Sequence, residues 1–319
     1  MEFYKYPSIE NSYREKFVDM VMGHPEFPRA GWQVTEKIHG ANFSFVVDKQ
    51  TGEVRVGKRS SLTDGGFYGC QEVLDRYRDR ILNLSTDELL DGCDAIQIYG
   101  ELYGDGIQKG VTYSEIKDFA AFDIRCIQGT DSRFMGTVFV ESLCEFYGVP
   151  HVPVIDTGCT FEAAMAYSGE FDSLIGYERI RGNAAEGVVI KPMSPMFLHG
   201  GSRVILKTKS DKFKERSSAK KVRVSDPFTD EMTAALDSLL EYLNENRLKN
   251  VLSKLGEVTQ KDFGVILGGL CQDVIEDWSK DNDWGVMDKK HRKAVTKELN
   301  KQGALLVRRN FLNIIDGVF

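Results

Sequence analysis

The sequence predicts an α+β domain followed by a smaller all-helical domain. Short strand patterns alternate with turns and a few helices over the first two-thirds of the chain, without the regular strand–helix repeat of a doubly wound sheet. Farther along, apolar residues recur at helical spacing. The composition changes at residues 225–227, so we expect one domain over residues 1–224 and a second over residues 225–319.

Turn residues bound the expected elements of the first domain. A hairpin is expected over residues 46–56, with its turn at residues 49–52. Helices are expected over residues 72–84, 139–147 and 161–167, and further strands over residues 33–35, 43–47, 95–101, 119–124, 186–191 and 203–207. In the second domain, Gly256 is expected to end one helix and Thr259 to cap the next.

Composition excludes several classes of protein. A hydrophobic fraction of 42% and a charged fraction of 28% are those of a soluble globular protein, and no apolar run approaches the roughly 20 residues of a membrane span. The N-terminus lacks the basic and apolar regions of a secretory signal. The six cysteines are scattered without Cys-x-x-Cys pairs, which favours reduced thiols and a cytoplasmic location, in the host if the protein is viral. Nothing in the sequence argues against a monomer.

The charge distribution is uneven. A net charge of −7 by itself argues against nucleic-acid binding. Between Arg203 and Arg223, however, the chain has nine basic residues and two acidic ones. Such a segment is either a solvated loop or a surface for phosphates.

Lys37 lies between two expected strands and is followed by Gly40. A lysine held in place can act as a nucleophile once its amine is deprotonated. The Lys-x-x-Gly spacing is weak evidence, because it recurs from Lys49 and from Lys261, where a hairpin turn and a helix explain it. Taken alone, Lys37 is more easily explained as a solvated surface lysine.

Charged side chains at other strand ends give Lys37 a context. A nucleoside triphosphate needs cations for its phosphates, carboxylates for a metal and the ribose, and an aromatic face for the base. The chain has no P-loop motif and no kinase catalytic loop. An ion pair at a sheet edge would explain any one of these charged residues alone, but together they suit a nucleoside triphosphate. The charged residues are Arg59, Glu101, Glu186, Lys191, Lys207 and Lys209.

The ordered motifs resemble those of the covalent nucleotidyltransferases, which include DNA ligases, RNA ligases and mRNA capping enzymes. The similar segments are residues 36–44, 58–59, 99–104, 121–124, 186–192 and 205–209. Residues 246–258, 261–264 and 272–273 extend the resemblance to the RNA ligase 2 family, which implies a nucleotidyltransferase domain of ATP-grasp-like antiparallel sheets and an all-α C-terminal domain. Ala41 departs from the family pattern by replacing a hydroxyl residue, and the segment over residues 161–185 is shorter than expected.

The resemblance implies an ATP-dependent RNA ligase. Such an enzyme joins a 3′-hydroxyl end to a 5′-phosphate end, here expected at nicks in duplex RNA or an RNA/DNA hybrid. Lys37 would carry AMP covalently, and AMP would then activate the RNA 5′-phosphate. The implied cofactors are ATP and Mg²⁺, for which Mn²⁺ can substitute.

The resemblance also implies roles for single residues. Phe122 would stack on adenine, Glu101 would hold a ribose hydroxyl, and Arg59 would hold the ribose or a phosphate. Lys37, Glu186, Lys207 and Lys209 would be catalytic, with the two later lysines on the α-phosphate and with Glu186 and Glu101 on the metal. His39 and Asn42 would orient the phosphate, and Asp123 would hold local structure or Arg59. The ATP-contacting set is Glu36, Lys37, Ile38, Asn42, Arg59, Glu101, Phe122, Lys191, Lys207 and Lys209.

In the helical domain, Arg247 and Asp273 match positions that engage the RNA end, although a helix-surface ion pair would also explain them. Three other functions compete with the ligase. The helical tail argues against a DNA ligase and against a capping-type guanylyltransferase, which carry an OB-fold after the core. A catalytically silent module that binds nucleic-acid ends would be expected to have lost some of these motifs, and none is missing.

Overall fold

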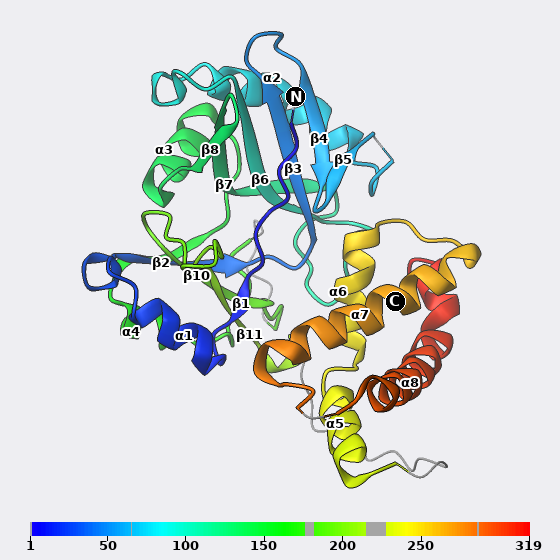
Figure 1. Cartoon of the computed structure of the whole chain (residues 1–319). Helices are drawn as coiled ribbons and strands as arrows, with labels where there is room; N and C mark the ends of the chain where they lie inside the picture. The colour runs from blue at the N-terminus through cyan, green and yellow to red at the C-terminus, as the bar shows by residue number, and fades with distance from the viewer. Residues whose placement is uncertain (1, 65, 176–181, 215–227, 286) are drawn as a thin grey trace. The chain divides into compact units, whose positions relative to one another are not determined.

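The computed structural model describes the chain except for residues 1, 65, 176–181, 215–227 and 286. It divides into two compact units, Met1–Lys212 and Phe213–Phe319. The first contains sheets and helices and the second only helices, which confirms the predicted fold class (Figure 1). The predicted domain boundary between residues 224 and 225 lies outside the described residues.

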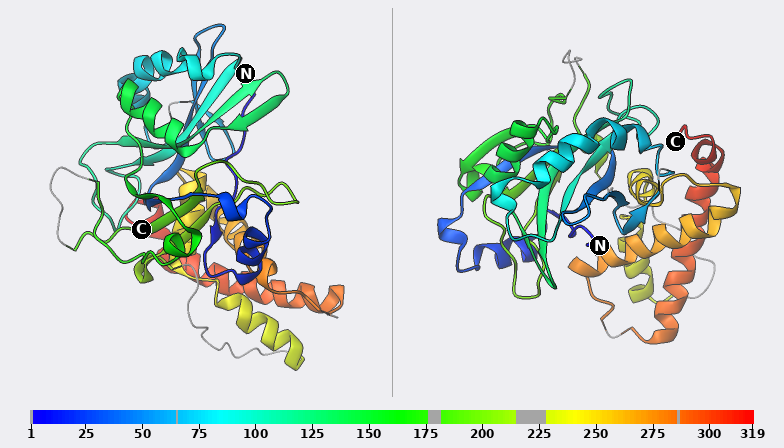
Figure 2. Two further views of the ribbon diagram at one scale, coloured as in Figure 1. Left: turned by 90° about the vertical axis from the view of Figure 1, so that its left-hand side faces the viewer. Right: turned by 90° about the horizontal axis from the view of Figure 1, so that it is seen from above.

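The larger sheet of the first unit has six strands among the described residues, in the order β5-β4-β3-β6-β7-β8, and every neighbouring pair is antiparallel. Helices α2 and α3 cover one face of this sheet (Figure 2) and bury apolar side chains against it. The strands are β3 Ala41–Asp48, β4 Val54–Lys58, β5 Ser61–Thr63, β6 Ala95–Tyr103, β7 Asp118–Gln128 and β8 Asp131–Phe134, and the helices are α2 Gln71–Ser85 and α3 Thr137–Tyr147.

The second sheet has five strands among the described residues, in the order β1-β11-β10-β2-β9. Its strands are antiparallel except for the parallel pair of β1 and β11. Trp32, Val34, Val188 and Ile190 form its core with residues of two helices. The strands are β1 Glu10–Asn11, β2 Trp32–Lys37, β9 Val154–Cys159, β10 Gly187–Pro192 and β11 Leu206–Lys209, and the helices are α1 Glu15–Met22 and α4 Phe161–Met165.

The register of this second sheet aligns two lysines. Gly187 at the start of β10 pairs with Lys37 on one side and with Lys209 on the other. A Cβ atom at Gly187 would lie 2.0 Å from the carbonyl oxygen of Thr208, and its φ of +145° is one that other residues rarely adopt. Glycine is therefore needed where β10 passes closest to β11.

The N-terminal segment connects the two sheets. Its Tyr4 N–H donates to Gln97 Oε1, and the Tyr99 hydroxyl donates to the Tyr4 carbonyl on the larger sheet. A few residues later, β1 pairs with β11 at the edge of the smaller sheet. The same short segment thus contacts β6 of one sheet and β11 of the other.

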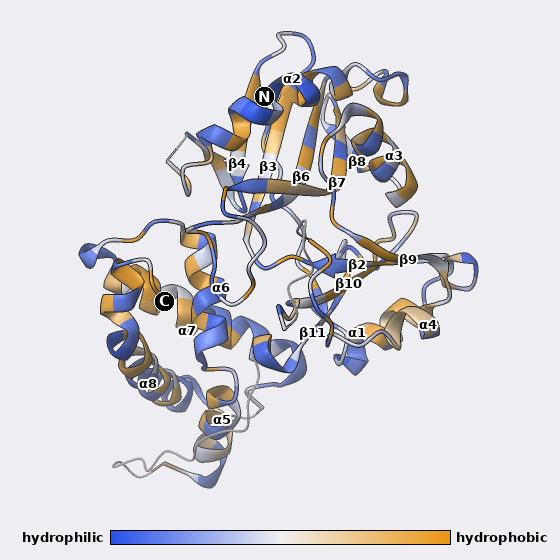
Figure 3. Ribbon diagram, turned by 180° about the vertical axis from the view of Figure 1, so that it is seen from behind, coloured by the Kyte–Doolittle hydropathy of each residue, from blue (hydrophilic) through white to orange (hydrophobic). Residues whose placement is uncertain are grey.

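The second unit consists of four α-helices among its described residues, and a 3₁₀ turn leads into the third. Leu236, Leu270, Val274 and Leu299 are fully buried in its apolar core, and Figure 3 shows apolar and polar faces on each helix. The helices are α5 Asp230–Leu240, α6 Glu245–Leu255, α7 Phe263–Asp281 and α8 Lys289–Ile315. The 3₁₀ turns of the chain are η1 Phe27–Arg29, η2 Glu88–Leu90, η3 Asp211–Phe213 and η4 Gln260–Asp262.

Most predicted elements are confirmed, including the hairpin turn, in which the Gly52 N–H donates to the Asp48 carbonyl. Gly256 ends α6 with a φ of +85°, and Thr259 forms a capping box with Asp262 just before α7. The strand predicted over residues 203–207 was placed too early. It begins at Leu206, because the residues before it turn away to pair Arg203 with Phe197.

All six cysteines lie in the described part of the chain, and none forms a disulfide. None of the described helices combines the length and the apolar character that crossing a membrane would require.

The close approach at Gly187 gives a stability prediction. We expect Gly187→Ala to lower the free energy of unfolding by about 3 kcal/mol or more, because backbone strain and overpacking add. Gly52→Ala is a matched control: Gly52 also has a positive φ, but no atom lies within 4 Å of a Cβ there, so the cost should be about 1–2 kcal/mol. Urea unfolding of both variants measures this, and equal costs would contradict the close approach.

Candidate active site

Lys37 is the last residue of β2, and the turn after it lies against β6. A Cβ atom at Gly40 would lie 2.2 Å from the Leu102 carbonyl oxygen, so only glycine fits where the turn meets that strand. The Lys37 ammonium donates to Glu186 Oε2 at 2.8 Å, and its side chain is only 17% exposed. The Lys37 side chain is therefore fixed by an ion pair and largely shielded from solvent.

Glu186 lies just before β10, and its carboxylate contacts nitrogen atoms of three side chains. Its Oε2 contacts the Lys37 ammonium, and its Oε1 lies 2.7 Å from Lys209 Nζ. His39 Nδ1 lies 3.4 Å from Oε2. Burial alone would raise the pKa of Glu186, but Lys209, Lys37 and His39 hold it well below the usual value. At neutral pH this carboxylate is an anion that binds two candidate catalytic lysines at once.

Lys207 and Lys209 occupy alternate positions of β11, so both side chains leave the same face of the sheet. Lys207 is half-buried and pairs in register with Val189, and Lys209 pairs with Gly187. The predicted phosphate lysines thus share a sheet face, and one of them reaches the Lys37–Glu186 pair.

Glu101 on β6 forms the second carboxylate of the site. It accepts a hydrogen bond from the Gly40 N–H at 3.2 Å and lies opposite Asn42 in the register of β3 and β6. The pKa of Glu101 is raised to about 7, mainly by burial and also by the charge of Glu186, against the opposing charges of Lys37 and Arg59. Glu101 therefore interacts electrostatically with Lys37, Glu186 and Arg59.

Phe122 and Lys191 belong to a neighbouring cluster around Asp123. The half-buried Phe122 ring packs edge-on against Tyr6, with ring centroids 4.9 Å apart, and its carbonyl oxygen accepts a hydrogen bond from Lys191 Nζ. Lys191 Nζ also lies 3.5 Å from Asp123, and burial lowers the pKa of this lysine. The Lys191 ammonium therefore supports the backbone that carries Phe122.

The expectation that Asp123 could hold Arg59 was wrong. Its carboxylate binds Arg203 through two hydrogen bonds of 2.8 and 2.9 Å and accepts a third from the Tyr6 hydroxyl. Burial alone would raise the pKa of Asp123, but Arg203 and Lys191 hold it below the usual value. The other expectation, that Asp123 holds local structure, is confirmed.

Arg203 also does not belong to a phosphate surface, as its place in the basic segment had suggested. It is buried, and its guanidinium stacks on Phe134 at 3.8 Å in addition to binding Asp123. The Lys212 ammonium donates to the Gly110 carbonyl. Residues 215–223 of that segment lie outside the described residues.

Two further ATP-contacting candidates are buried, as Lys191 is. Glu36 accepts hydrogen bonds from the Ser173 hydroxyl at 2.6 Å and from the Leu174 N–H at 2.7 Å, and Ile38 is buried. Burial raises the pKa of Glu36 against these hydrogen bonds. The His39 N–H donates to the Tyr113 hydroxyl. These contacts fix the backbone on both sides of Lys37.

Sequence reasoning missed Tyr6, Tyr113, Ser173 and the role of Arg203. Each lies far along the chain from the residue it contacts; Tyr6 and Asp123, for example, are 117 positions apart. No local pattern marks such pairs, because strand pairing between distant segments brings them together.

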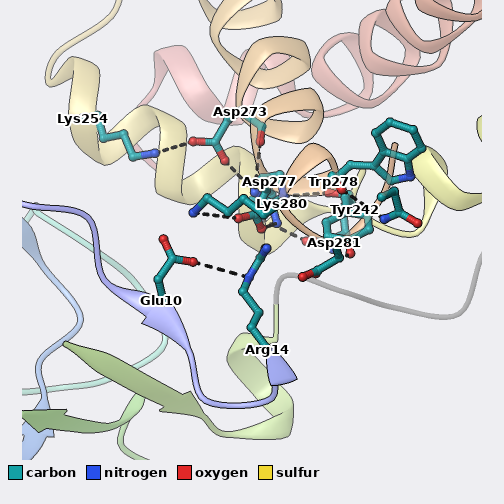
Figure 4. Close-up of polar contacts among 12 residues, drawn as sticks. Glu10, Arg14, Tyr242, Lys254, Asp273, Asp277, Trp278, Lys280 and Asp281 are labelled. Carbon is teal, nitrogen blue, oxygen red and sulfur yellow. Dashed lines mark hydrogen bonds and ion pairs between the residues drawn. The ribbon is translucent and has the colours of Figure 1, made fainter. Parts of the chain in front are cut away.

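In the second unit, Arg247 lies within a cluster of carboxylates. Its guanidinium donates to Asp273 at 2.7 Å, to Asp277 at 2.6 Å and to the Tyr242 carbonyl at 2.8 Å. Lys254 contacts Asp273 from another side (Figure 4). The predicted pair of Arg247 and Asp273 is therefore present, but Arg247 is 1% exposed and not on the helix surface.

The carboxylates that could hold a metal are Glu101 and Glu186. No group of three or more His, Cys, Asp or Glu among the described residues is arranged to hold a metal ion. Mg²⁺ is commonly bound by one or two carboxylates together with substrate phosphates. The two glutamates would supply the protein's part of such a site.

Comparison with known families identifies the chain. Residues 30–209 match the RNA ligase family model, and residues 225–304 match the model for the T4 RNA ligase 2 C-terminal domain. The chain belongs to the RNA ligase family. All the candidate site residues of the first unit lie within the first match, and Arg247 and Asp273 lie within the second.

Curated relatives of this RNA ligase family member come from Trypanosoma brucei brucei. RNA-editing ligase 2, mitochondrial, is 26% identical over 90% of this chain and 85% of its own length. RNA-editing ligase 1, mitochondrial, is 26% identical over 79% of this chain and 71% of its own length. A solved Naegleria gruberi RNA ligase variant with ATP and Mn aligns with 17% identity and a TM-score of 0.48. The alignment covers 67% of this chain and 58% of that chain.

The raised pKa of Glu101 predicts a pH dependence of stability. Between about pH 4.5 and 7 the folded ligase keeps the Glu101 proton that the unfolded chain releases, so this group destabilises the fold as pH rises. Glu101→Gln lacks this effect. The free energy of unfolding of Glu101→Gln minus that of the wild type should therefore rise by about 1–3 kcal/mol between pH 5 and pH 8. Urea unfolding at several pH values measures the difference, and a constant difference would contradict the raised pKa.

The Arg247 cluster predicts a large effect in the helical unit. Arg247→Ala should lower the free energy of unfolding by about 3–5 kcal/mol, because it removes a buried cation and leaves the half-buried Asp273 and Asp277 with a lysine each. Arg309→Ala is the control: it removes an exposed pair with Glu245 and should cost less than about 1 kcal/mol. Chemical denaturation compares the two variants, and similar small costs would show that the cluster does not stabilise the unit.

Proposed function

We propose that this protein is an ATP-dependent RNA ligase whose Lys37 becomes covalently bound to AMP. The observation that carries the proposal is the ion pair of Lys37 with Glu186, shared with Lys209, in the part of the chain that matches the RNA ligase model. A half-buried lysine between a buried carboxylate and a phosphate-binding cation has the setting that a lysyl-AMP intermediate requires.

In the first step, the Lys37 amine attacks the α-phosphorus of ATP. A bond forms between Nζ and phosphorus, the bond from phosphorus to the bridging oxygen breaks, and pyrophosphate leaves. The amine must lose a proton to solvent before or during attack, since an ammonium is not a nucleophile. In the structure the Lys37 ammonium is bound to Glu186, so we propose that the arriving phosphates separate this pair.

The neighbouring cations stabilise the charge that develops on the phosphate. Lys209 lies at the same carboxylate as Lys37, and Lys207 leaves the same face of β11. Ammonium groups already in place when the pentavalent phosphorus forms lower its energy without reorganising. Both lysines would contact the α-phosphate, and His39 and Asn42 would orient it.

The nucleoside would lie between the two clusters of the first unit. Phe122 offers a half-buried aromatic ring, and Lys191 donates a hydrogen bond to the Phe122 carbonyl. Glu101 and Arg59 would hold the ribose. The nucleotide is proposed to be ATP, in keeping with the Naegleria ligase solved with ATP and Mn.

Glu186 and Glu101 fit a divalent metal, because they are two carboxylates that interact electrostatically across the site. A bound Mg²⁺ or Mn²⁺ would polarise the phosphate oxygens. As the nucleotide binds, Glu186 would release Lys37 and bind the metal instead.

The later steps act on RNA. AMP passes from Lys37 to the 5′-phosphate of one RNA end, and a 3′-hydroxyl then attacks that phosphate and releases AMP. We propose that a monomer acts at nicks in a duplex, with Arg247 and Asp273 contributing to engagement of the RNA end. The name of the T4 RNA ligase 2 C-terminal model and the trypanosome editing ligases support RNA as the substrate.

Transfer of a labelled AMP group to the protein tests the proposal. Incubation with α-³²P-ATP and Mg²⁺, followed by denaturing electrophoresis, should label the wild type, and Lys37→Ala should lose about 10³-fold or more of the signal. Lys49→Ala is the control, because Lys49 starts the same Lys-x-x-Gly spacing in a hairpin turn and should keep full labelling. Labelling that persists in Lys37→Ala, or an unlabelled wild type, would refute the assignment.

Two further arms of the same assay define the substrates. Labelled GTP should give no adduct if the nucleotide is ATP. Nicked duplexes with RNA or DNA on the 3′-hydroxyl side, compared with single-stranded ends, should show sealing at the RNA nick. A preference for GTP or for an all-DNA nick would instead indicate a guanylyltransferase or a DNA ligase.

A further inference from the structure

The charges of the helical unit are segregated along the chain. Helix α8, Lys289–Ile315, contains eight basic residues and one acidic residue. Residues 230–281 contain eleven acidic and five basic residues, and the whole protein has a net charge of −7. One helix therefore carries a strong positive charge in an otherwise acidic protein.

The first half of α8 presents this charge to solvent. Val295 and Leu299 are fully buried in the core of the unit. Every exposed residue from Lys289 to Lys301, a stretch described in full, is basic except Asn300. We call the exposed set the α8 basic stripe, and its members are Lys289, Lys290, Arg292, Lys293, Lys297 and Lys301.

Folding does not explain the stripe. Positive charges in the first turn of a helix oppose the positive end of the helix dipole, and α8 has no acidic residue in its first turn. Lysines at i and i+4, such as Lys289, Lys293 and Lys297, repel one another along the same side of the helix. Two acidic residues offset part of this charge: Asp288 caps the helix beside Lys290, and Glu298 pairs with Lys301 at 2.8 Å and interacts with Lys297. The arrangement costs stability in the isolated protein, and a bound polyanion would relieve it.

We propose that the α8 basic stripe binds the phosphate backbone of duplex RNA. Lysines four residues apart follow one another at about 6 Å along the axis, and Lys289 to Lys301 spans about 18 Å, which suits a row of phosphates rather than a single anion. Lysine ammonium groups bind phosphates as mobile point charges without reading sequence. A protein partner is disfavoured, because protein interfaces are depleted in lysine and the stripe exposes no apolar side chain.

This inference rests on the proposed function for the identity of the polyanion as RNA. It adds a set of duplex-contacting residues to Arg247 and Asp273. Because the contact is to backbone charge, it contributes affinity and salt dependence but no sequence preference.

The test measures binding of a fluorescent nicked RNA duplex to the full chain at several salt concentrations. The stripe variant is Lys289→Gln/Lys293→Gln/Lys297→Gln, which leaves the Glu298 partner Lys301 in place. The slope of log affinity against log salt should fall by about 3, and affinity at low salt should fall about tenfold or more. The control, Lys5→Gln/Lys16→Gln/Lys261→Gln, removes the same charge from exposed lysines elsewhere and should keep the wild-type slope.

Thermal unfolding and labelling separate the outcomes. The stripe variant should have an equal or higher Tm, since it removes repulsion, so weaker binding cannot be attributed to unfolding. AMP labelling of the wild type is measured in the same preparation: its absence would reject the proposed function, whereas an unchanged salt slope in the stripe variant would reject this inference. An unchanged slope is also the result expected if the stripe binds an acidic protein.

Discussion

The site depends on one buried carboxylate. Glu186 binds Lys37 through one oxygen and Lys209 through the other, with His39 also in reach. A carboxylate in this position lets two lysines lie close together although their charges repel each other. The lysines in turn lower the pKa of Glu186, so it stays ionised although it is buried. The pairing is useful for a ligase only if it can be exchanged, because Lys37 must leave the carboxylate to attack a phosphate. In the proposed mechanism, Glu186 holds Lys37 and Lys209 together before the nucleotide binds and releases Lys37 when it does.

The two sheets supply the rigidity that this exchange needs. Gly187 places Lys37 and Lys209 in one row of β2, β10 and β11, and its close contact with β11 leaves no room for another residue. A second buried carboxylate, Asp123, binds Arg203 and Tyr6 beside Phe122. One carboxylate thus organises the proposed phosphate end of the site and the other organises its proposed adenine end, while the N-terminal segment contacts both sheets.

Much of this could be predicted from the sequence, because strand patterns and charged strand ends are local. The Lys49 turn, the Gly256 helix end and the positions of Lys37 and Lys209 at strand ends all follow from short segments, whereas the strand expected to end at Glu101 continues to Tyr103. The partners of the charges could not be predicted, since they depend on the register of strands far apart in the chain. For that reason Arg203 was grouped with a basic segment expected to be a solvated loop or a phosphate surface, and it is instead buried against Asp123. The basic residues of α8 were not recognised as a set, because their common exposure appears only once the buried face of the helix is known.

The most direct test of the account is a crystal structure of the protein with Mg²⁺ and an ATP analogue that has a methylene group between the α- and β-phosphates, which prevents transfer. The account predicts that Lys37 Nζ will have left Glu186 and will lie within about 3.5 Å of the α-phosphorus, opposite the leaving group. Lys209 should contact an α-phosphate oxygen. A structure in which Lys37 remains bound to Glu186 while the α-phosphate lies against a different nucleophile would contradict it.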